Sequence, residues 1–234
     1  MQDNEDKDPA VEALLKELAP GGRRRLLDPI DRNSEVLFGL FMVLTFTGTL
    51  SVASAGREEI RSMLVAAIGC NIAWGFVDGV MYVARNLVVR GRKARLVQAV
   101  HAAARPEETH GLIADEIGGL SGALGSQELE RVRQWIIARP SGEFPAARVT
   151  GRDLRGALGV FTLVFASTFP VVLPFVFIAD PSIAKRVSAA IAIAMLFLCG
   201  YGWGRYAGQK PWRAGLVMVL LGVIVEAIVI ALGG

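Results

Sequence analysis

Two polar residues, Asn71 and Asp78, interrupt an apolar stretch that covers residues 63–84. Together with Gly75 and Tyr82 they recur at steps of three to four, so all four share one face of a helix. A carboxylate inside a bilayer costs about 2.5–3.5 kcal/mol even on lenient scales, so it is expected to face a polar cavity, a partner or a bound cation. This face is the first candidate for a cation site.

A second set of donors lies in the preceding apolar run, residues 36–55. Glu35, Met42 and Thr49 are seven residues apart and fall on one helical face, with a carboxylate at the mouth and a thioether and a hydroxyl deeper. They form a candidate cation path. The alternative is a helix start, with Ser34 as N-cap, followed by ordinary packing. The short turn after this run makes the two apolar runs antiparallel neighbours.

Two later runs carry further candidates. Pro170 and Pro174 lie one turn apart in residues 157–178, where each removes a backbone donor and frees carbonyl groups. They predict a kinked gate or, alternatively, a bent packing helix. Ser167 and Thr168 lie just before the kink. In the last run, Glu226 is either a coupling carboxylate or a neutral glutamic acid near the outer face.

The polar segment between the second and third runs contains a short cluster of potential metal ligands. The cluster consists of Glu107, Glu108, His110, Asp115 and Glu116. Carboxylates and an imidazole suit a divalent cation, although the spacing matches neither HExxH nor an EF-hand loop. The alternative is a solvated helix with a charged face.

These candidates must be positioned by helices in a membrane. The chain has 234 residues, 53% of them hydrophobic, and a mean hydropathy of +0.44. The predicted fold is all-α: a polytopic membrane protein with five transmembrane helices and a cytoplasmic helical insertion between the second and third. Residues 1–33 are predicted to form a cytoplasmic segment with a short amphipathic helix, and residues 34–84 the first two spans. Residues 85–153 form the predicted insertion, which is the candidate metal-collecting domain. Residues 154–234 contain the last three predicted spans, at 157–178, 187–206 and 214–232.

Smaller features complete the prediction. Apolar side chains at helical spacing predict amphipathic helices over 92–105 and from 126 to 140 in the insertion. A stripe of small residues, Gly200, Gly204 and Gly208, predicts close helix packing. Cys70 and Cys199 both lie in apolar runs, which argues against a disulfide framework.

The distribution of basic residues predicts the topology. The connections after the first and third spans contain only Arg57, Arg61, Lys185 and Arg186, and the other 21 of the 25 Lys and Arg residues lie on the opposite side. This places the N-terminus and the insertion in the cytoplasm and the C-terminus outside. Because the basic residues sit at the ends of spans, the lipid bilayer rather than nucleic acid is the expected partner. No signal peptide is expected before the first run.

The C-terminal sequence resembles a known family. FPVVLPF, followed by LFLCGYGWGRYAGQKPWRAGLVMVLLG, is similar to the C-terminal half of the vacuolar iron transporter (VIT/CCC) family. The resemblance covers about residues 36–84 and 155–234. It implies a homodimeric carrier that moves Fe²⁺ or Mn²⁺ out of the cytoplasm in exchange for protons, with the family's metal-binding insertion at 85–150.

Two departures suggest a divergent bacterial-type member in the inner membrane. The Asp-Gly pair expected near the start of the first span is replaced by RNSEVLFG, which leaves Glu35 as the nearby carboxylate. The insertion also lacks the repeated Glu-x-x-Glu pattern.

The sequence favours one class of function over two others. The favoured class is a proton-coupled transporter with Fe²⁺ or Mn²⁺ as substrate and no tightly bound cofactor. The second is a non-transporting membrane adaptor that recruits partners through its cytoplasmic helices, with Asp78 bonded to Asn71 or to a first-span threonine. An enzyme is not expected, because no GxSxG, HExxH or paired catalytic histidine is present.

Overall fold

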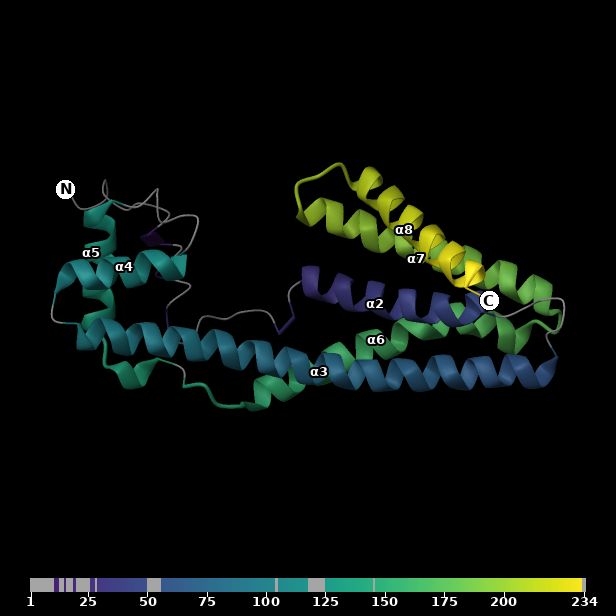
Figure 1. Cartoon of the computed structure of the whole chain (residues 1–234), viewed down its shortest axis with the longest axis horizontal. Coiled ribbons are helices and arrows are strands. Elements are labelled where there is room, and N and C mark those ends of the chain that lie inside the picture. Colours follow the sequence, from purple (N-terminus) through teal and green to yellow (C-terminus); the bar gives the residue numbers. More distant parts are fainter. Residues whose placement is uncertain are drawn as a thin grey trace, which may run out of the picture. The chain divides into compact units, whose positions relative to one another are not determined.

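The computed structural model describes residues 11–12, 15, 19, 26–27, 29–49, 56–103, 105–117, 125–144 and 146–232, without the side chains of residues 116 and 117. Every regular element in these ranges is a helix, which confirms the all-α prediction. The elements are α2 (Pro29–Gly48), α3 (Arg57–Ala102), α4 (Pro106–Ile117), α5 (Ser126–Ile137), the 3₁₀ turn η2 (Ser141–Glu143), α6 (Gly151–Phe177), α7 (Pro181–Tyr206) and α8 (Pro211–Ala231) (Figure 1).

The chain forms two compact units. One, called the insertion unit, consists of residues 1–24 and 84–150; the other, called the membrane unit, consists of residues 25–83 and 151–234. Helix α3 contributes to both, because it continues without a break for 46 residues.

The continuity of α3 corrects the prediction of a span ending at residue 84 and a separate amphipathic helix over 92–105. The residues between these two segments, RNLVVRG, include no proline, and the single Gly91 costs a helix only about 1 kcal/mol. The next proline is Pro106, so the helix continues to Ala102. Helix α6 likewise begins at Gly151, six residues before the start predicted at residue 157.

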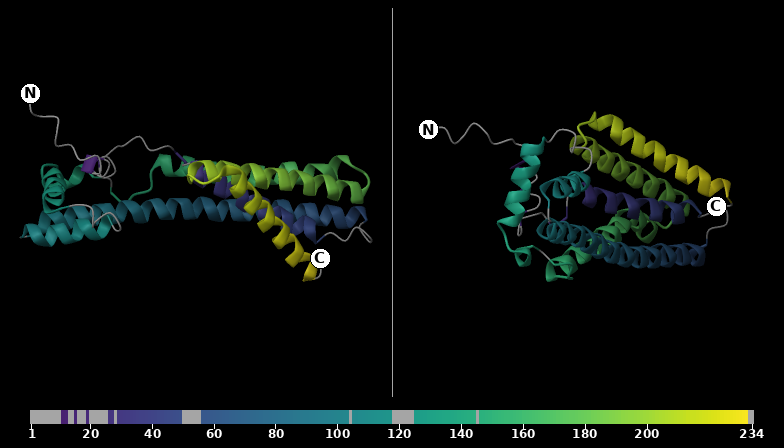
Figure 2. Two further views of the ribbon diagram at one scale, coloured as in Figure 1. Left: turned by 90° about the horizontal axis from the view of Figure 1, so that it is seen from above. Right: turned by 60° about the vertical axis from the view of Figure 1, so that its left-hand side comes forward.

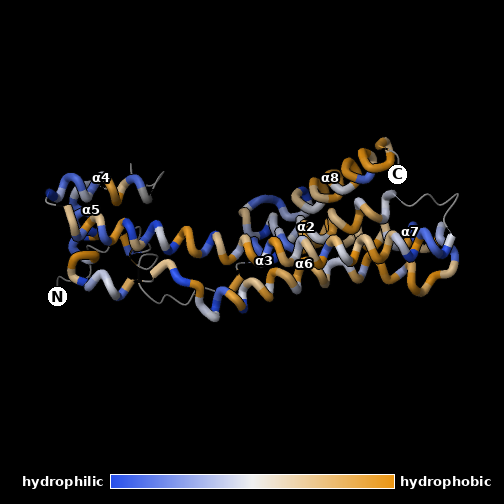
Figure 3. The backbone as a smooth tube through the Cα atoms, turned by 60° about the horizontal axis from the view of Figure 1, so that its bottom comes forward, coloured by the Kyte–Doolittle hydropathy of each residue, from blue (hydrophilic) through white to orange (hydrophobic). Residues whose placement is uncertain are grey.

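Among the described residues, four helices are long and apolar enough to cross a membrane: α3, α6, α7 and α8. Within α8 only Gly215 and Gly222 are buried, and most residues of this helix are hydrophobic (Figure 3). A helix that is apolar all round and scarcely buried by protein is typical of contact with lipid. The fifth predicted span, residues 36–55, remains a prediction, because α2 ends at Gly48 and residues 50–55 lie outside the described ranges.

Helix α2 lies at the centre of the membrane unit, in contact with α6, α7 and α8 (Figure 2). Its fully buried side chains include Leu40 and Val43, which pack with Ala67 of α3, Val171 of α6 and Leu196 of α7. Burying a leucine of this kind contributes about 1.5–3 kcal/mol relative to exposure in water, and close packing then fixes the helix positions.

The insertion unit has its own apolar core. Leu96, Val97 and Val100 of α3 pack with Val132 and Ile136 of α5. These are the apolar faces that the sequence predicted for two amphipathic helices, and both are covered inside this unit. Most of the predicted N-terminal helix lies outside the described residues, although Val11 joins this core. Cys70 and Cys199 are free thiols, as predicted.

Candidate cation site

The polar face of α3 packs closely against α6. A Cβ atom on Gly75 would lie 3.1 Å from Phe161 Cδ2 and 3.2 Å from the Phe161 carbonyl oxygen, and one on Gly79 would lie 3.1 Å from the Ala157 carbonyl oxygen. The two glycines therefore let the backbones of α3 and α6 approach each other. Asp78 lies between them in sequence and is half-buried.

Asp78 has an unsatisfied carboxylate oxygen. Its Oδ2 atom is buried and accepts no hydrogen bond from the residues that the structure describes. A carboxylate in a membrane helix is costly unless a cation, a proton or donors compensate it. Asp78 Oδ2 is therefore a candidate to bind a cation or a proton.

The groups proposed to hold Asp78 in the adaptor hypothesis are bonded elsewhere. The hydroxyl of Thr45 donates to the Phe41 carbonyl at 2.9 Å, and the hydroxyls of Thr47 and Thr49 likewise donate to carbonyls of their own helix. The amide of Asn71 donates to the Ala67 carbonyl at 3.1 Å. Such bonds within one helix are common for threonine in membrane spans.

Three buried side-chain oxygens have no hydrogen-bond partner among the described residues: Asn71 Oδ1, Asp78 Oδ2 and Thr168 Oγ1. All three belong to α3 and α6, the two helices that meet at Gly75 and Gly79. Buried polar atoms are nearly always bonded, so a group of exceptions on two packed helices indicates a site for a cation or water. Sequence reasoning noted Thr168 only as a neighbour of the proline kink.

One turn further along α3, Tyr82 contacts the segment before α2 and the start of α6. The Tyr82 hydroxyl donates a hydrogen bond of 2.7 Å to the Leu26 carbonyl, and the ring lies so close to Gly156 that a Cβ atom there would overlap it. Spacing alone placed Tyr82 on this face but gave no information about Leu26, which is 56 residues away.

The candidates on α2 lie away from its most buried positions. Met42 is half-buried, and Thr49 is exposed with its hydroxyl bonded to the Phe46 carbonyl. Glu35 is half-buried in the first half of the helix. The prediction that Ser34 caps this helix is wrong: α2 begins five residues earlier at Pro29, a residue favoured at the first helical position.

Glu226 of α8 lies against the end of α2 rather than among lipid-facing residues. Its Oε1 atom would be 3.6 Å from a Cβ atom on Gly48, and the Nζ of Lys185 donates to the Gly48 carbonyl at 3.5 Å. Lys185 is close enough to attract the Glu226 carboxylate electrostatically. The acid therefore lies beside a base in the membrane unit.

The two prolines lie inside α6, which remains one helix from Gly151 to Phe177. The hydroxyl of Ser188 on α7 donates to the Val171 carbonyl at 2.6 Å, next to the Pro170 carbonyl that Pro174 deprives of its donor. A neighbouring helix therefore supplies a hydrogen bond to this part of the α6 backbone. The gating role of Pro170 and Pro174 remains a prediction.

Two of the three glycines of the predicted small-residue stripe, Gly200 and Gly204, pack against α8, whereas Gly208 does not. Cβ atoms on Gly200 and Gly204 would lie 2.7 Å from the Ala214 carbonyl oxygen and 2.8 Å from Ala214 Cβ of α8, respectively. Gly208, with a φ of +66°, lies in the turn between α7 and α8, where glycine tolerates this conformation best.

The ligand cluster predicted in the insertion is not gathered by the described side chains. Glu107, Glu108 and Asp115 are exposed, and no group of three His, Cys, Asp or Glu residues that could hold a metal occurs in the part of the chain that the structure describes. The side chain of Glu116 is outside this part. Metal collection by the insertion therefore stays a prediction.

His110 is instead bonded to a residue that sequence reasoning did not pair with it. Its Nε2 donates to Glu130 Oε2 of α5 at 3.0 Å, because a carboxylate can only accept. This bond, with those from Gln134 and Arg133, lowers the pKa of Glu130 below its ordinary value. The pair joins α4 to α5.

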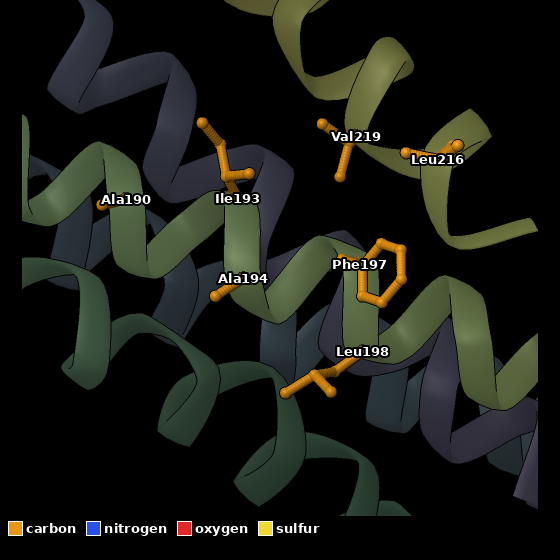
Figure 4. A pocket seen from close by; sticks show the side chains of 7 residues that line it. All are labelled: Ala190, Ile193, Ala194, Phe197, Leu198, Leu216 and Val219. Carbon is orange, nitrogen blue, oxygen red and sulfur yellow. The ribbon is translucent and has the colours of Figure 1, made fainter. Parts of the chain in front are cut away.

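An open groove between α7 and α8 has a different character. It measures about 620 Å³ and is lined only by apolar residues, among them Ile193 and Phe197 of α7 and Val219 of α8 (Figure 4). Without oxygen, nitrogen or sulfur donors such a groove does not bind a cation. The candidate site is therefore at the α3–α6 contact.

These features define an all-helical membrane protein with unpaired oxygens between two spanning helices. The model of the VIT family matches residues 119–234, the C-terminal half of the chain, and the chain belongs to this family of membrane metal-ion transporters. No curated protein matches the chain. The family match begins after α3, so the case for Asn71 and Asp78 depends on this structure rather than on the match.

Proposed function

We propose that this protein transports Fe²⁺ or Mn²⁺ out of the cytoplasm in exchange for protons. The observation that supports the proposal most strongly is the buried, unpaired Oδ2 of Asp78 at the contact of two membrane helices. Membership of the VIT family makes a metal ion the expected substrate.

Asp78 would be the residue at which metal and proton exchange. Mn²⁺ and Fe²⁺ accept carboxylate oxygens as ligands, and a metal ion binds the deprotonated form of its ligand. Ion binding would therefore release the proton of Asp78, and ion release would let the carboxylate take up a proton from the opposite side. Because Asp78 would bind either the metal ion or a proton, but never both at once, the movement of the metal ion is coupled to that of the proton.

Other residues have supporting roles in this proposal. Glu35, Met42 and Thr49 would offer further oxygen and sulfur ligands along α2, and Glu226 beside Lys185 would receive the ion or proton near the far end. Pro170 and Pro174 would allow α6 to bend between two access states. The acids of α4 would collect the ion from the cytoplasm, and two copies of the chain would form the carrier.

The structure offers a physical argument against the adaptor alternative. An adaptor needs free apolar helix faces to bind partners, whereas the amphipathic faces of α3 and α5 in the insertion unit cover each other through Val97, Val100, Val132 and Ile136. In addition, neither Asn71 nor the threonines of α2 are hydrogen-bonded to Asp78 Oδ2.

The proposal is tested by Mn²⁺ uptake into proteoliposomes with and without a pH gradient. We expect uptake that depends on the gradient and that Asp78→Asn abolishes. Glu143→Gln, which removes an exposed acid of the insertion unit, is the matched control and should transport at the wild-type rate. Wild-type uptake by Asp78→Asn would refute the role of this residue. A folded protein without flux for Mn²⁺ or Fe²⁺ would favour the adaptor.

A further inference from the structure

We propose that Asn71 and Thr168 form a second station for the transported ion, separate from Asp78 and deeper along α3. The inference depends on the proposed transport function and extends it to a site that neither the family match nor the acidic residues indicate. The ligand would be a divalent cation that keeps part of its water shell.

The two side chains are fully buried and each has one unused oxygen. Asn71 is 0% exposed; its amide nitrogen is used by the Ala67 carbonyl, and its Oδ1 has no partner among the described residues. Thr168 is 1% exposed. Its usual acceptor four residues earlier, the Val164 carbonyl, accepts a 2.7 Å hydrogen bond from the Ser167 hydroxyl instead.

The pairing of α3 with α6 places these residues within one helical turn of each other in depth. The contacts of Gly79 with Ala157 and of Gly75 with Phe161 show that the helices run antiparallel, so that one turn along α3 corresponds to one turn back along α6. Asn71 is therefore level with about residue 165, roughly 4.5 Å along the axis from Thr168 at a rise of 1.5 Å per residue.

The core of the membrane unit is consistent with this register. Ala67, one turn beyond Asn71, belongs to the same core cluster as Val171 and Val172, which lie one turn beyond Thr168. Asn71 and Thr168 therefore lie between the contact of Gly75 with Phe161 on one side and this shared apolar cluster on the other.

Helix α2 contacts α6 at the depth of Asn71 and Thr168. Gly39 is buried there, and a Cβ atom on it would lie 2.7 Å from the Val164 carbonyl oxygen and would overlap the Ser167 hydroxyl. Phe38 of α2 meets Trp74 of α3 edge to face, with ring centroids 5.5 Å apart. The station is thus located where α2, α3 and α6 come together.

The chemistry of this station differs from that of Asp78. Amide and hydroxyl oxygens are hard, neutral ligands that suit Mn²⁺ or Mg²⁺-like ions and their bound waters, but they do not neutralise the charge. Asp78 lies seven residues away on α3, roughly 10 Å along the axis. A neutral station at that distance can accept the ion from the carboxylate and still release it, because conduction requires binding that is not too tight.

The test compares Mn²⁺ uptake by wild type, Thr168→Val and Asn71→Leu in proteoliposomes. We expect each substitution to lower uptake about tenfold or more and Thr168→Ser, which keeps the hydroxyl, to restore most of it. Thr47→Val and Thr162→Val are matched controls, because their hydroxyls donate to Leu44 and Leu158 of their own helices. These controls should remain within about twofold of wild type.

A second measurement separates the station from general damage to the fold. Thr168→Val replaces an unpaired hydroxyl with a methyl group of the same shape, so we expect the melting temperature to be unchanged or raised. Mn²⁺ binding by the detergent-solubilised variant should also persist, since Asp78 is intact. Lower uptake with retained binding and stability supports the proposal.

The outcomes that overturn it are distinct from those that overturn the transport function. Wild-type uptake by both Thr168→Val and Asn71→Leu, while Asp78→Asn is inactive, would refute the second ion site. The proposed transport function would then still hold. An equal loss in Thr47→Val would also refute it, because the effect would then be one of packing. Absence of uptake by folded wild type would refute both.

Discussion

Tyr82 and Leu26 are joined by a 2.7 Å hydrogen bond from the tyrosine hydroxyl to the leucine carbonyl, although 56 residues separate them. Tyr82 follows Asp78 by one helical turn, and its ring covers Gly156 at the start of α6. The bond therefore ties the segment that leads into α2 to the candidate site on α3.

Replacing Tyr82 by phenylalanine removes this bond and keeps the ring. We expect a loss of about 1 kcal/mol in the free energy of unfolding, as for a typical buried hydrogen bond, which corresponds to a melting temperature lower by about 2–4 °C. Thermal unfolding in one detergent measures it. Tyr201→Phe, at an exposed tyrosine of α7, is the control, and an equal shift in both variants would contradict the expectation.

Gly200 lies so close to α8 that alanine does not fit. Its Cβ atom would be 2.7 Å from the Ala214 carbonyl oxygen and 2.9 Å from Gly215 Cα, both backbone atoms that cannot turn away. We expect Gly200→Ala to destabilise the fold by about 1–3 kcal/mol, as overpacking does. Gly69→Ala, at a helical glycine with nothing within 4 Å, should be neutral or stabilising. Equal melting temperatures for the two variants would show that α7 and α8 are less closely packed.

The His110–Glu130 pair predicts a pH dependence of stability. The pKa of Glu130 is lower in the folded protein than in the unfolded chain, so its ionised form stabilises the fold. This contribution is complete above the unfolded pKa of about 4.3 and is lost as the pH falls through the lowered folded pKa. Because the pair is partly exposed, it should amount to less than about 1 kcal/mol.

The measurement is the difference in melting temperature between wild type and Glu130→Gln as a function of pH. We expect wild type to be the more stable near neutral pH and the difference to disappear in the acid range. Glu143→Gln should show no such trend. A melting-temperature difference that grows as the pH falls would have the opposite sign to the one expected and would exclude this contribution of Glu130.

Glu226 and Lys185 should prove to be energetically coupled. In a double-mutant cycle with Glu226→Gln and Lys185→Gln, we expect the double variant to lose about 0.5–1 kcal/mol less stability than the two single variants together. Their attraction near Gly48 is the reason. Chemical unfolding in mixed micelles supplies the free energies, and strict additivity would mean that the two charges do not interact.

The sequence predicted those features that depend on local pattern. Apolar runs located α6, α7 and α8, and helical spacing identified the buried faces of Val97 and Val132. The family resemblance at the C-terminal end was confirmed. Asp78 stood out because a charge in an apolar run is rare on energetic grounds.

Features that depend on long-range packing could not be predicted in this way. Helix α3 is unbroken because it contains no strong helix breaker. The change from apolar to basic composition along this segment makes it look like two separate helices in the sequence. The partners of His110 and Tyr82 are 20 and 56 residues away, and no local pattern relates them. Thr168 looks like any membrane threonine until its usual acceptor is seen to be taken by Ser167.

Helix α8 has only two buried positions, and both are glycines: Gly215 against the Phe197 ring and Gly222 against the Leu196 side chain. Its close approach to α7 depends on the missing side chains at these two positions, while Met218 and Val219 pack against the core beside them. A survey of all substitutions along α8 would then give an uneven profile. Aliphatic residues would be interchangeable at most positions, Gly215 and Gly222 would tolerate nothing larger, and charge would be selected at Glu226.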